Sequence, residues 1–399
     1  MILSKRYVNL ILGSVLLLNT IFMAVFSYIP RYLFDYLKVD ITSIQLIVTI
    51  FPFTWFVFPP LLGKLSDKIQ NRLLFMIVGA VGLILTIIFL MLTLNLILII
   101  ILLLFFGLFS TSCSINLVLF QEYVENDQIY ISYYNAMTVL GWFLGAFLGG
   151  IFIDIYGIES IFQFILIFSI INIIFVLFIR EKRALILERQ LRDPNAKKEE
   201  TLLDDSEEIS PISKSIYGSL FFRNFGIRPI ISVLSIIMAF HLSTNTEIGF
   251  LIGANPLIQF FLIILMGRII KDKNIKFFMI CGYCLSVIVI IGYIFSNDFF
   301  GYLLCQILIS FSYSMFFTAT QIYIAKNTNP ENKGKYTGYA SSSFYCGSFM
   351  GGLFFSLLLF TYSDYYISMI FMIIFPLISA LIILFKFETI QESNLEKYS

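Results

Sequence analysis

The sequence has few of the residues that build metal, redox or nucleotide sites. It contains one histidine, His241, and no cluster of histidine with glutamate that could bind a metal. Its five cysteines are scattered, and the single CxxC spacing, Cys281 to Cys284, lies in an apolar segment where cysteine behaves as a small hydrophobic residue. A Gly-Lys-Ser P-loop and a paired-aspartate prenyl-transfer motif are both absent from the sequence. We therefore expect no catalytic residues, no metal and no cofactor, and we predict that the protein is not an enzyme.

Charge is also scarce, since only 13% of the 399 residues are charged and 59% are hydrophobic. A soluble protein could not cover so much apolar surface. A helix that crosses the hydrocarbon core needs roughly 20 apolar residues, and isolated strands cannot cross it because their edges stay unpaired. We predict an all-α integral membrane protein with twelve transmembrane helices, at about 7–29, 43–62, 73–93, 96–119, 131–153, 158–179, 216–242, 247–267, 276–295, 299–322, 337–360 and 364–386.

The positive charges are distributed unevenly between the two sides of this topology. If the N-terminus lies inside, 22 of the 26 lysines and arginines fall on the cytoplasmic side, only Arg31 and Lys38 fall outside, and Arg223 and Arg228 lie in the seventh segment. Cytoplasmic loops of membrane proteins carry such an excess. We predict a multi-pass protein of the plasma membrane with both termini cytoplasmic, functioning as a monomer in the lipid bilayer. The sequence shows no selectivity-filter motif of a channel.

One polar stretch divides the chain. Residues 181–215 carry mixed charges together with Pro194 and Pro211, which is typical of a solvated connector rather than of a nucleic-acid site. We predict an N-terminal six-helix bundle at 1–180, a cytoplasmic linker at 181–215, a C-terminal six-helix bundle at 216–386 and a cytoplasmic tail at 387–399.

A glycine pattern occurs twice, 202 residues apart. Gly141–Gly150 aligns with Ser343–Gly352, and the Gly-Gly pairs coincide. Two equivalent halves in an apolar chain indicate a transporter built from repeats. Small residues four apart share one helix face and let two helices approach closely. The predicted helix-packing residues are Gly141, Gly145, Gly149, Gly150, Gly347, Gly351 and Gly352.

A second repeat lies after the second segment of each half, at residues 63–72 and 267–273. The first copy resembles the signature loop of the major facilitator superfamily, roughly G-x-L-x-D-[RK]-x-G-[RK]-[RK]; it departs at Gln70 and Asn71. The resemblance implies that Gly63 permits close helix packing and that Asp67 faces a helix N-terminus, where an anion is favoured. The predicted conformational-loop residues are Gly63, Asp67, Lys68, Arg72, Gly267 and Asp272.

The glycine pattern of the fifth segment is also similar to one in the drug and metabolite antiporters of that superfamily. The proline of their G-x3-G-P-x2-G-G pattern is replaced here by Ala146. The resemblance implies export, but the missing proline leaves uptake equally open.

Polar residues inside the predicted membrane segments indicate a substrate pathway. A charge at the bilayer centre costs at least about 2.5–3.5 kcal/mol, so it usually has a partner or a water-filled cavity. Arg223 could face a central cavity and bind an anionic group, or it could be an anchor at the cytoplasmic interface. The predicted pathway residues are Arg223, Asn224, Asn19, Asn116, Asn135, Trp142, Asn255, Gln259, Gln306, Tyr313 and Gln321.

These observations predict a secondary active transporter that moves a small organic solute by alternating access. The direction is left open between efflux and the uptake or exchange of an anionic metabolite, and a transporter-like membrane sensor is the rival hypothesis. The coupling ion is left open between proton and sodium. Neither nucleic acid nor a cofactor is an expected partner.

Overall fold

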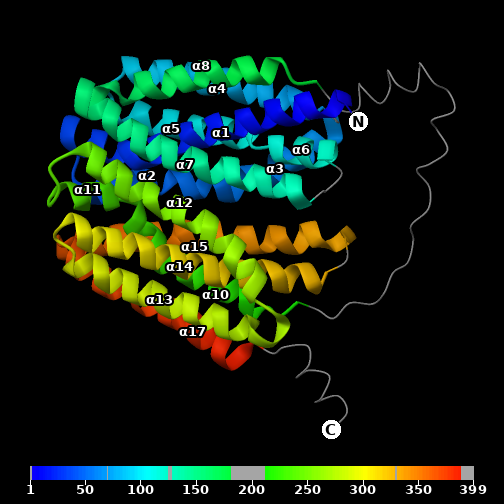
Figure 1. Ribbon diagram of the computed structural model, residues 1–399. Coiled ribbons are helices and arrows are strands. Elements are labelled where there is room, and N and C mark those ends of the chain that lie inside the picture. Colours follow the sequence, from blue (N-terminus) through cyan, green and yellow to red (C-terminus); the bar gives the residue numbers. More distant parts are fainter. Residues whose placement is uncertain (1, 70, 125–127, 181–211, 329, 388–399) are drawn as a thin grey trace, which may run out of the picture. The chain divides into compact units, whose positions relative to one another are not determined.

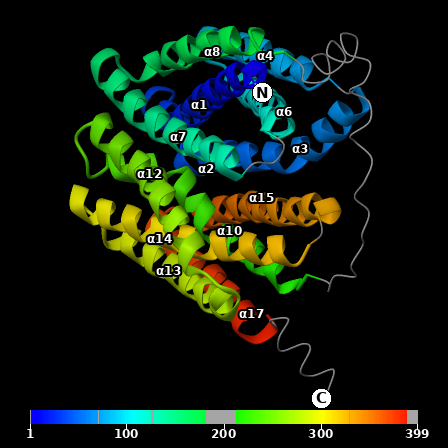
Figure 2. The ribbon, with the colours of Figure 1, turned by 45° about the vertical axis from the view of Figure 1, so that its right-hand side comes forward.

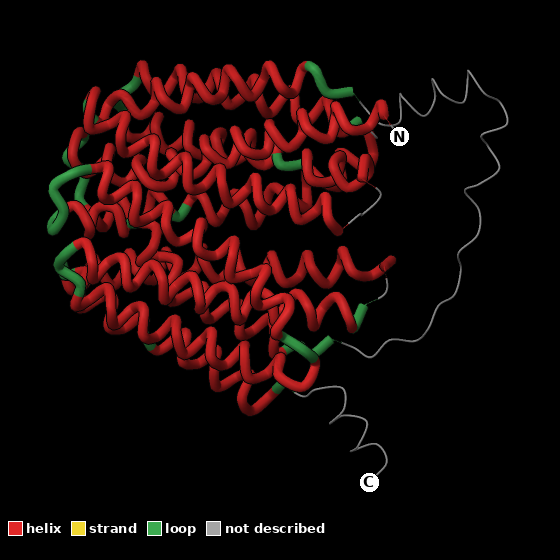
Figure 3. The backbone as a smooth tube through the Cα atoms, in the orientation of Figure 1, coloured by secondary structure: helices red, strands yellow, loops and turns green. Residues whose placement is uncertain are grey.

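The computed structural model describes residues 2–69, 71–124, 128–180, 212–328 and 330–387, and all of its regular structure is helical (Figures 1 and 3). The elements of the first sequence half are α1 (Ile2–Arg31), η1 (Tyr32–Tyr36), α2 (Ile41–Val48), α3 (Ile50–Ile69), α4 (Arg72–Leu92), α5 (Leu96–Cys113), α6 (Asn116–Val124), α7 (Gln128–Tyr156), η2 (Ile158–Ser160) and α8 (Ile161–Leu177). Those of the second half are α10 (Ser215–Ser232), α11 (Leu234–Ala239), α12 (Asn245–Ile269), η4 (Asp272–Asn274), α13 (Ile275–Phe295), α14 (Phe299–Lys326), α15 (Pro330–Tyr362), α16 (Tyr365–Met372) and α17 (Ile374–Lys386).

The chain forms two compact units, each of which combines distant segments. The first unit contains residues 1–23, 57–142 and 162–208, and the second contains residues 24–56, 143–161 and 209–399. The second unit therefore includes parts of α1, α3 and α7 together with all helices from α10 onward. The predicted linker and tail lie almost entirely outside the described residues, and the domain boundaries proposed from the sequence stay predictions.

Eleven helical spans among the described residues are long and apolar enough to cross a membrane. They overlap eleven of the twelve predicted segments. The remaining segment, 216–242, is occupied by α10 and α11, which are separated at Val233. It contains two arginines, Arg223 and Arg228, and this polarity distinguishes it from the other eleven.

Prolines explain two breaks inside predicted segments. A proline has no N–H to donate to the carbonyl four residues earlier, and its ring clashes with that carbonyl. Pro52 lies four residues after Val48, where α2 ends, and Pro376 lies four residues after Met372, where α16 ends. The helical pairs α2 with α3 and α16 with α17 are thus interrupted segments, whereas α12 continues through Pro256.

Each unit has its own apolar core. In the first unit, residues of α1, α6 and α8 such as Ile11, Leu119 and Val176 pack together. In the second unit, α10, α13, α14 and α17 lie side by side (Figures 1 and 2). Tyr283 and Phe316 stack in that core at 5.2 Å between ring centroids. Arg223 of α10 contacts this core through Phe316.

Candidate substrate site and conformational segments

Arg223 lies inside the second unit with 1% of its surface exposed. Its Nε donates to Ser286 Oγ on α13 at 3.2 Å, and its Nη1 donates to Asn224 Oδ1 at 3.1 Å. Its Cζ lies 4.4 Å from the ring centroid of Phe316 on α14, a cation–π contact. No carboxylate pairs with it among the described residues. The guanidinium is therefore enclosed by hydroxyl, amide and aromatic groups rather than snorkelling to an interface.

Arg228, five residues further along α10, differs from Arg223 in its surroundings. It is only partly buried, and its Cζ lies 5.0 Å from the ring centroid of Phe344 on α15. Within the described ranges, its guanidinium has neither a hydrogen bond to protein nor a carboxylate partner. Since a guanidinium carries five N–H donors, these donors are available to solvent or to a bound anion.

Aromatic side chains surround the Arg228 position. The ring of Tyr345 lies 5.2 Å from that of Phe344, and the ring centroid of Tyr313 lies 5.9 Å from Arg223 Cζ. The ring of Tyr345 lies 5.8 Å from that of Trp55 on α3, and Tyr313 stacks on Phe317 at 4.8 Å. A positive charge between aromatic faces can bind the anionic group of a solute whose remaining part is apolar. We call Arg228, Tyr313, Phe344, Tyr345 and Trp55 the arginine–aromatic site.

Four members of this site are not among the pathway residues predicted from the sequence: Arg228, Trp55, Phe344 and Tyr345. Arg228 was placed only in the seventh membrane segment. The sequence does contain a signal for Arg228, because a second arginine in the same membrane segment carries the same insertion cost as Arg223. The direction of an aromatic side chain, by contrast, cannot be read from helical spacing alone.

Several predicted pathway residues form hydrogen bonds with one another or with neighbouring polar side chains. In the first unit, Trp142 Nε1 donates to Asn19 Oδ1 at 2.9 Å, and Tyr134 Oη donates to Asn116 Oδ1 at 2.8 Å. In the second unit, Asn255 Oδ1 accepts from Gln259 Nε2 at 2.6 Å and from Ser310 Oγ at 3.0 Å. These contacts join α1 to α7, α6 to α7 and α12 to α14.

Three other predicted pathway residues have no side-chain hydrogen bond in the described part of the chain. Asn135 is exposed on α7, Gln306 is buried on α14, and Gln321 is partly buried near the end of α14. Asn224 instead accepts a hydrogen bond from Arg223 through Oδ1 and donates one from Nδ2 to Leu220 O at 2.7 Å. The assignment of all these residues to a substrate pathway stays a prediction.

The segment expected as a loop at 63–72 is mainly helical. Gly63, Asp67 and Lys68 lie in the last turns of α3, and Arg72 is the first residue of α4. Arg72 donates to Ser66 Oγ at 2.6 Å. A Cβ at Gly63 would meet no atom within 4 Å, so the close helix packing that the resemblance implies there is not present among the described residues. The Asp67 side chain lies outside the described part.

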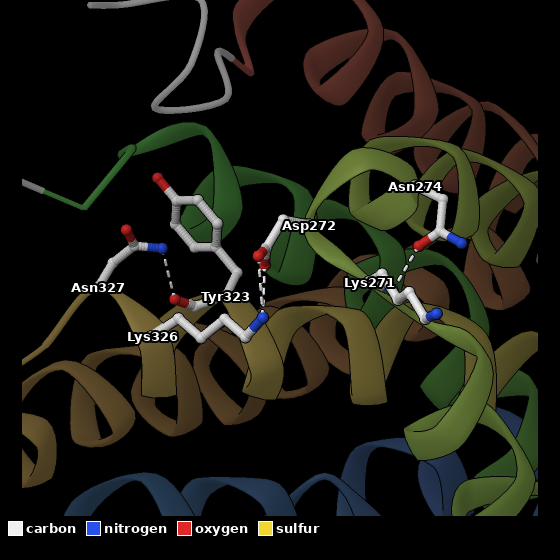
Figure 4. Close-up of polar contacts among 6 residues, drawn as sticks. All are labelled: Lys271, Asp272, Asn274, Tyr323, Lys326 and Asn327. Atoms are coloured by element: carbon white, nitrogen blue, oxygen red, sulfur yellow. Dashed lines mark hydrogen bonds and ion pairs between the residues drawn. The ribbon is translucent and has the colours of Figure 1, made fainter.

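The second copy of this segment contains an exposed ion pair (Figure 4). Lys326 Nζ, at the end of α14, lies 2.8 and 2.9 Å from the two carboxylate oxygens of Asp272. Asn274 Oδ1 accepts from the backbone N–H of Lys271 at 2.6 Å. A Cβ at Gly267 would meet no atom within 4 Å. Asp272 therefore pairs with a lysine in its own half.

The glycine stripes lie at close helix contacts, as small residues at this spacing allow. A Cβ at Gly141 would approach Leu16 O of α1 at 2.5 Å. Cβ atoms at Gly347 and Gly351 would clash with the carbonyl oxygens of Phe221 and Phe225 on α10. Gly149 would meet Tyr28, Gly150 the carbonyl of Asn245 and Gly352 the side chain of Thr49, while Gly145 is buried.

Comparison with known families matches the chain twice to one family model, described as Major Facilitator Superfamily, at residues 10–216 and 216–397. The chain belongs to the Major Facilitator Superfamily.

Solved structures agree with this membership at the level of the fold. The nucleoside transporter NupG matches with a TM-score of 0.75 and 12% identity, over 96% of this chain and 100% of NupG. A POT family transporter in complex with 5-aminolevulinic acid matches with a TM-score of 0.75 and 13% identity, over 95% of each chain. The human organic anion transporter MFSD10 matches with a TM-score of 0.64 and 15% identity, over 95% and 99%. No curated protein sequence matches the chain.

Membership in the Major Facilitator Superfamily confirms the predicted fold class, an all-α membrane protein with twelve transmembrane helices in two pseudo-symmetric six-helix bundles. It also confirms that the protein is a transporter rather than an enzyme. The two family matches meet at residue 216, in agreement with the repeat of 202 residues.

Proposed function

We propose that this Major Facilitator Superfamily protein carries a small organic anion across the membrane by alternating access, and that the arginine–aromatic site binds the anion. The observation that supports the proposal is Arg228, which is partly buried in the second unit and has neither hydrogen bond nor carboxylate partner within the described ranges. A charge inside a membrane-spanning helix is costly unless something compensates it. A carboxylate or phosphate of the solute would compensate it through bidentate hydrogen bonds.

Arg223 also favours an anionic solute, although its position does not allow direct contact with one. It is 1% exposed and is held by Ser286 and Asn224, so it adds positive potential without offering a contact. The faces of Trp55, Tyr313 and Tyr345 would pack against an apolar or aromatic portion of the solute. The preferred substrate would thus combine one anionic group with a planar or apolar body.

The proposal is tested by ligand-induced thermal stabilisation of the detergent-purified carrier. Organic acids such as benzoate are compared with their uncharged amides, such as benzamide, because each pair differs mainly in the anionic group. A ligand at 100 times its dissociation constant should stabilise the protein by about 2.7 kcal/mol. We expect stabilisation by acids only, and we expect Arg228→Gln to abolish it. Equal stabilisation by amides, or an unchanged response of Arg228→Gln, would refute the anion site.

The matched control for Arg228→Gln is Lys326→Gln. It removes one positive charge from the same half of the chain, but Lys326 pairs with Asp272 on the surface. The control should keep the full response to acids. Counterflow of the stabilising acid in proteoliposomes then separates a carrier from a membrane sensor, since a sensor binds without saturable exchange.

Efflux is the second candidate, and the glycine stripe of α7 supports it through its resemblance to the drug and metabolite antiporters. Ala146 replaces their proline, and α7 is helical from Gln128 to Tyr156. Under this hypothesis lipophilic drugs would stabilise the protein, and Arg228→Gln would have no effect on that response. We further propose a monomer in the plasma membrane with cytoplasmic termini, coupled to protons or sodium.

A further inference from the structure

The first turn of α12 has an acceptor for each of its four leading backbone N–H groups. A helix leaves these groups without partners inside the helix. The Thr244 N–H is bound by Glu247 Oε2 at 3.2 Å, and the Glu247 N–H is bound by Thr244 Oγ1 at 3.1 Å, which together form a capping box. The other two, Asn245 and Thr246, donate to Asp154 at 2.9 and 2.8 Å. Half of the cap thus comes from another helix, α7.

The carboxylate of Asp154 also binds the side chains of the same two residues. Oδ1 accepts from Asn245 Nδ2 at 2.8 Å, and Oδ2 accepts from Thr246 Oγ1 at 2.5 Å. Asp154 lies two residues before the end of α7, where the dipole of its own helix disfavours a negative charge. The N-terminus of α12 favours that charge. The contact between α7 and α12 therefore accounts for the position of this carboxylate.

The backbones of α7 and α12 approach closely just beside Asp154. A Cβ at Gly150 would clash with the carbonyl oxygen of Asn245, and a Cβ at Gly249 would clash with that of Ala146. Tyr28 Oη donates to Ala146 O at 2.7 Å. The region is a close contact of small residues with a charged cap at its end.

α7 belongs to the first sequence repeat and α12 to the second, and alternating access moves one repeat against the other. A contact that joins the repeats at one end must form in one carrier state and break in the other. Asp154 follows the fifth span, so the predicted topology puts this contact on the outer side.

We propose that Asp154 is a positioning residue of the transport cycle, a latch whose carboxylate stabilises the state in which α7 and α12 are in contact at the outer side. Losing the carboxylate removes two charge-assisted bonds to backbone N–H groups and shifts the carrier toward the state with α7 and α12 apart. The proposal is independent of which solute is carried.

The test is a distance measurement by pulsed electron resonance between spin labels at positions 156 and 243, which flank the contact and are exposed. Cys281, Cys284 and Cys346, which are not buried, are first replaced by serine. We expect one dominant short distance in the parent protein. In Asp154→Asn the ratio of long to short distances should rise about tenfold, which corresponds to about 1.4 kcal/mol.

Glu247→Gln is the matched control, because it removes a carboxylate from the same helix terminus but alters only the capping bond inside α12. It should leave the distances unchanged. Thr246→Val, which removes one side-chain donor and keeps the backbone donors, should produce a smaller shift and covers the case in which Asp154→Asn does not fold. Unchanged distances in both Asp154→Asn and Thr246→Val, or an equal shift in Glu247→Gln, would overturn the proposal.

Discussion

The N-terminus of α12 and the guanidinium of Arg228 belong to the same unit but differ in how completely their N–H groups are hydrogen-bonded. Every leading N–H group of α12 has an acceptor, half of them from Asp154. Arg228 has none among the described residues. Polar groups that are fully bonded hold one arrangement of the helices, whereas a partly buried charge without a hydrogen bond is costly until a ligand binds it. The first region is thus suited to stabilising a conformation and the second to recognising a solute.

The largest expected effect comes from separating α7 and α12. Gly249→Leu should push the α12 backbone away from Ala146, with a cost of about 3 kcal/mol, since overpacking typically costs 1–3 kcal/mol and sometimes more. The melting temperature should fall, or the spin-label distance across the contact should lengthen. Gly267→Leu, on the same helix but with open space around it, is the control. Equal destabilisation by both substitutions would show that the loss of stability comes from leucine in α12 itself and not from the contact with α7.

A smaller loss of stability is expected when Arg223 loses a hydrogen-bond partner and so becomes more like Arg228. Ser286→Ala removes the acceptor of Arg223 Nε, and losing a hydrogen bond to a charged group costs about 1.5–3 kcal/mol. Chemical denaturation in detergent should show this loss of stability. Because Ser286 Oγ also lies 2.7 Å from Ser312 Oγ, Ser312→Ala is the comparison that separates the two bonds. A fully stable Ser286→Ala variant would contradict the role of Ser286 as partner of Arg223.

Arg228→Lys should weaken solute binding about tenfold without lowering stability in the absence of ligand, a difference of about 1.4 kcal/mol. Lysine keeps the charge but loses the planar fork that binds a carboxylate bidentately. Titration calorimetry with the best organic acid measures this change. If affinity is unchanged while stability falls, the residue supports the fold rather than the solute.

The smallest effect is expected at the ion pair of Lys326 and Asp272, whose side chains are 53% and 71% exposed. Exposed pairs contribute about 0–1 kcal/mol. Asp272→Asn should therefore change the melting temperature by little, and high salt should remove even that difference. A large loss of stability in low salt would indicate a role for Asp272 beyond this pair.

The fold was largely predictable from the sequence because lipid imposes a simple length and polarity rule. Each of the twelve predicted segments overlaps helices of the structure, and the seventh departs from the rule because Arg223 and Arg228 make it polar. The ends of the spans were less predictable. α3 continues to Ile69, since a helix that leaves the membrane does not have to stop at the interface.

The candidate site was only partly predictable. Spacing identified the glycine stripe, whose contacts with Phe221 and Phe225 the structure shows, but it missed Gly249 and its contact with Ala146. It singled out Arg223, yet the arginine without any hydrogen bond or carboxylate partner among the described residues is Arg228. Two arginines five residues apart on one helix point in different directions, and their partners come from α13, α14 and α15. Such partners are set by tertiary packing, which a single sequence does not reveal.

The polarity of α10 also has a consequence for how the protein is made. An arginine at the centre of a helix opposes insertion into the bilayer by about 2.5–3.5 kcal/mol, and α10 carries two. Ser286 on α13 and Phe316 on α14 contact Arg223, and they are synthesised some 60 to 90 residues after it. We therefore expect α10 to enter the membrane poorly as the leading helix of its half, and to settle there only once those later helices have emerged from the ribosome.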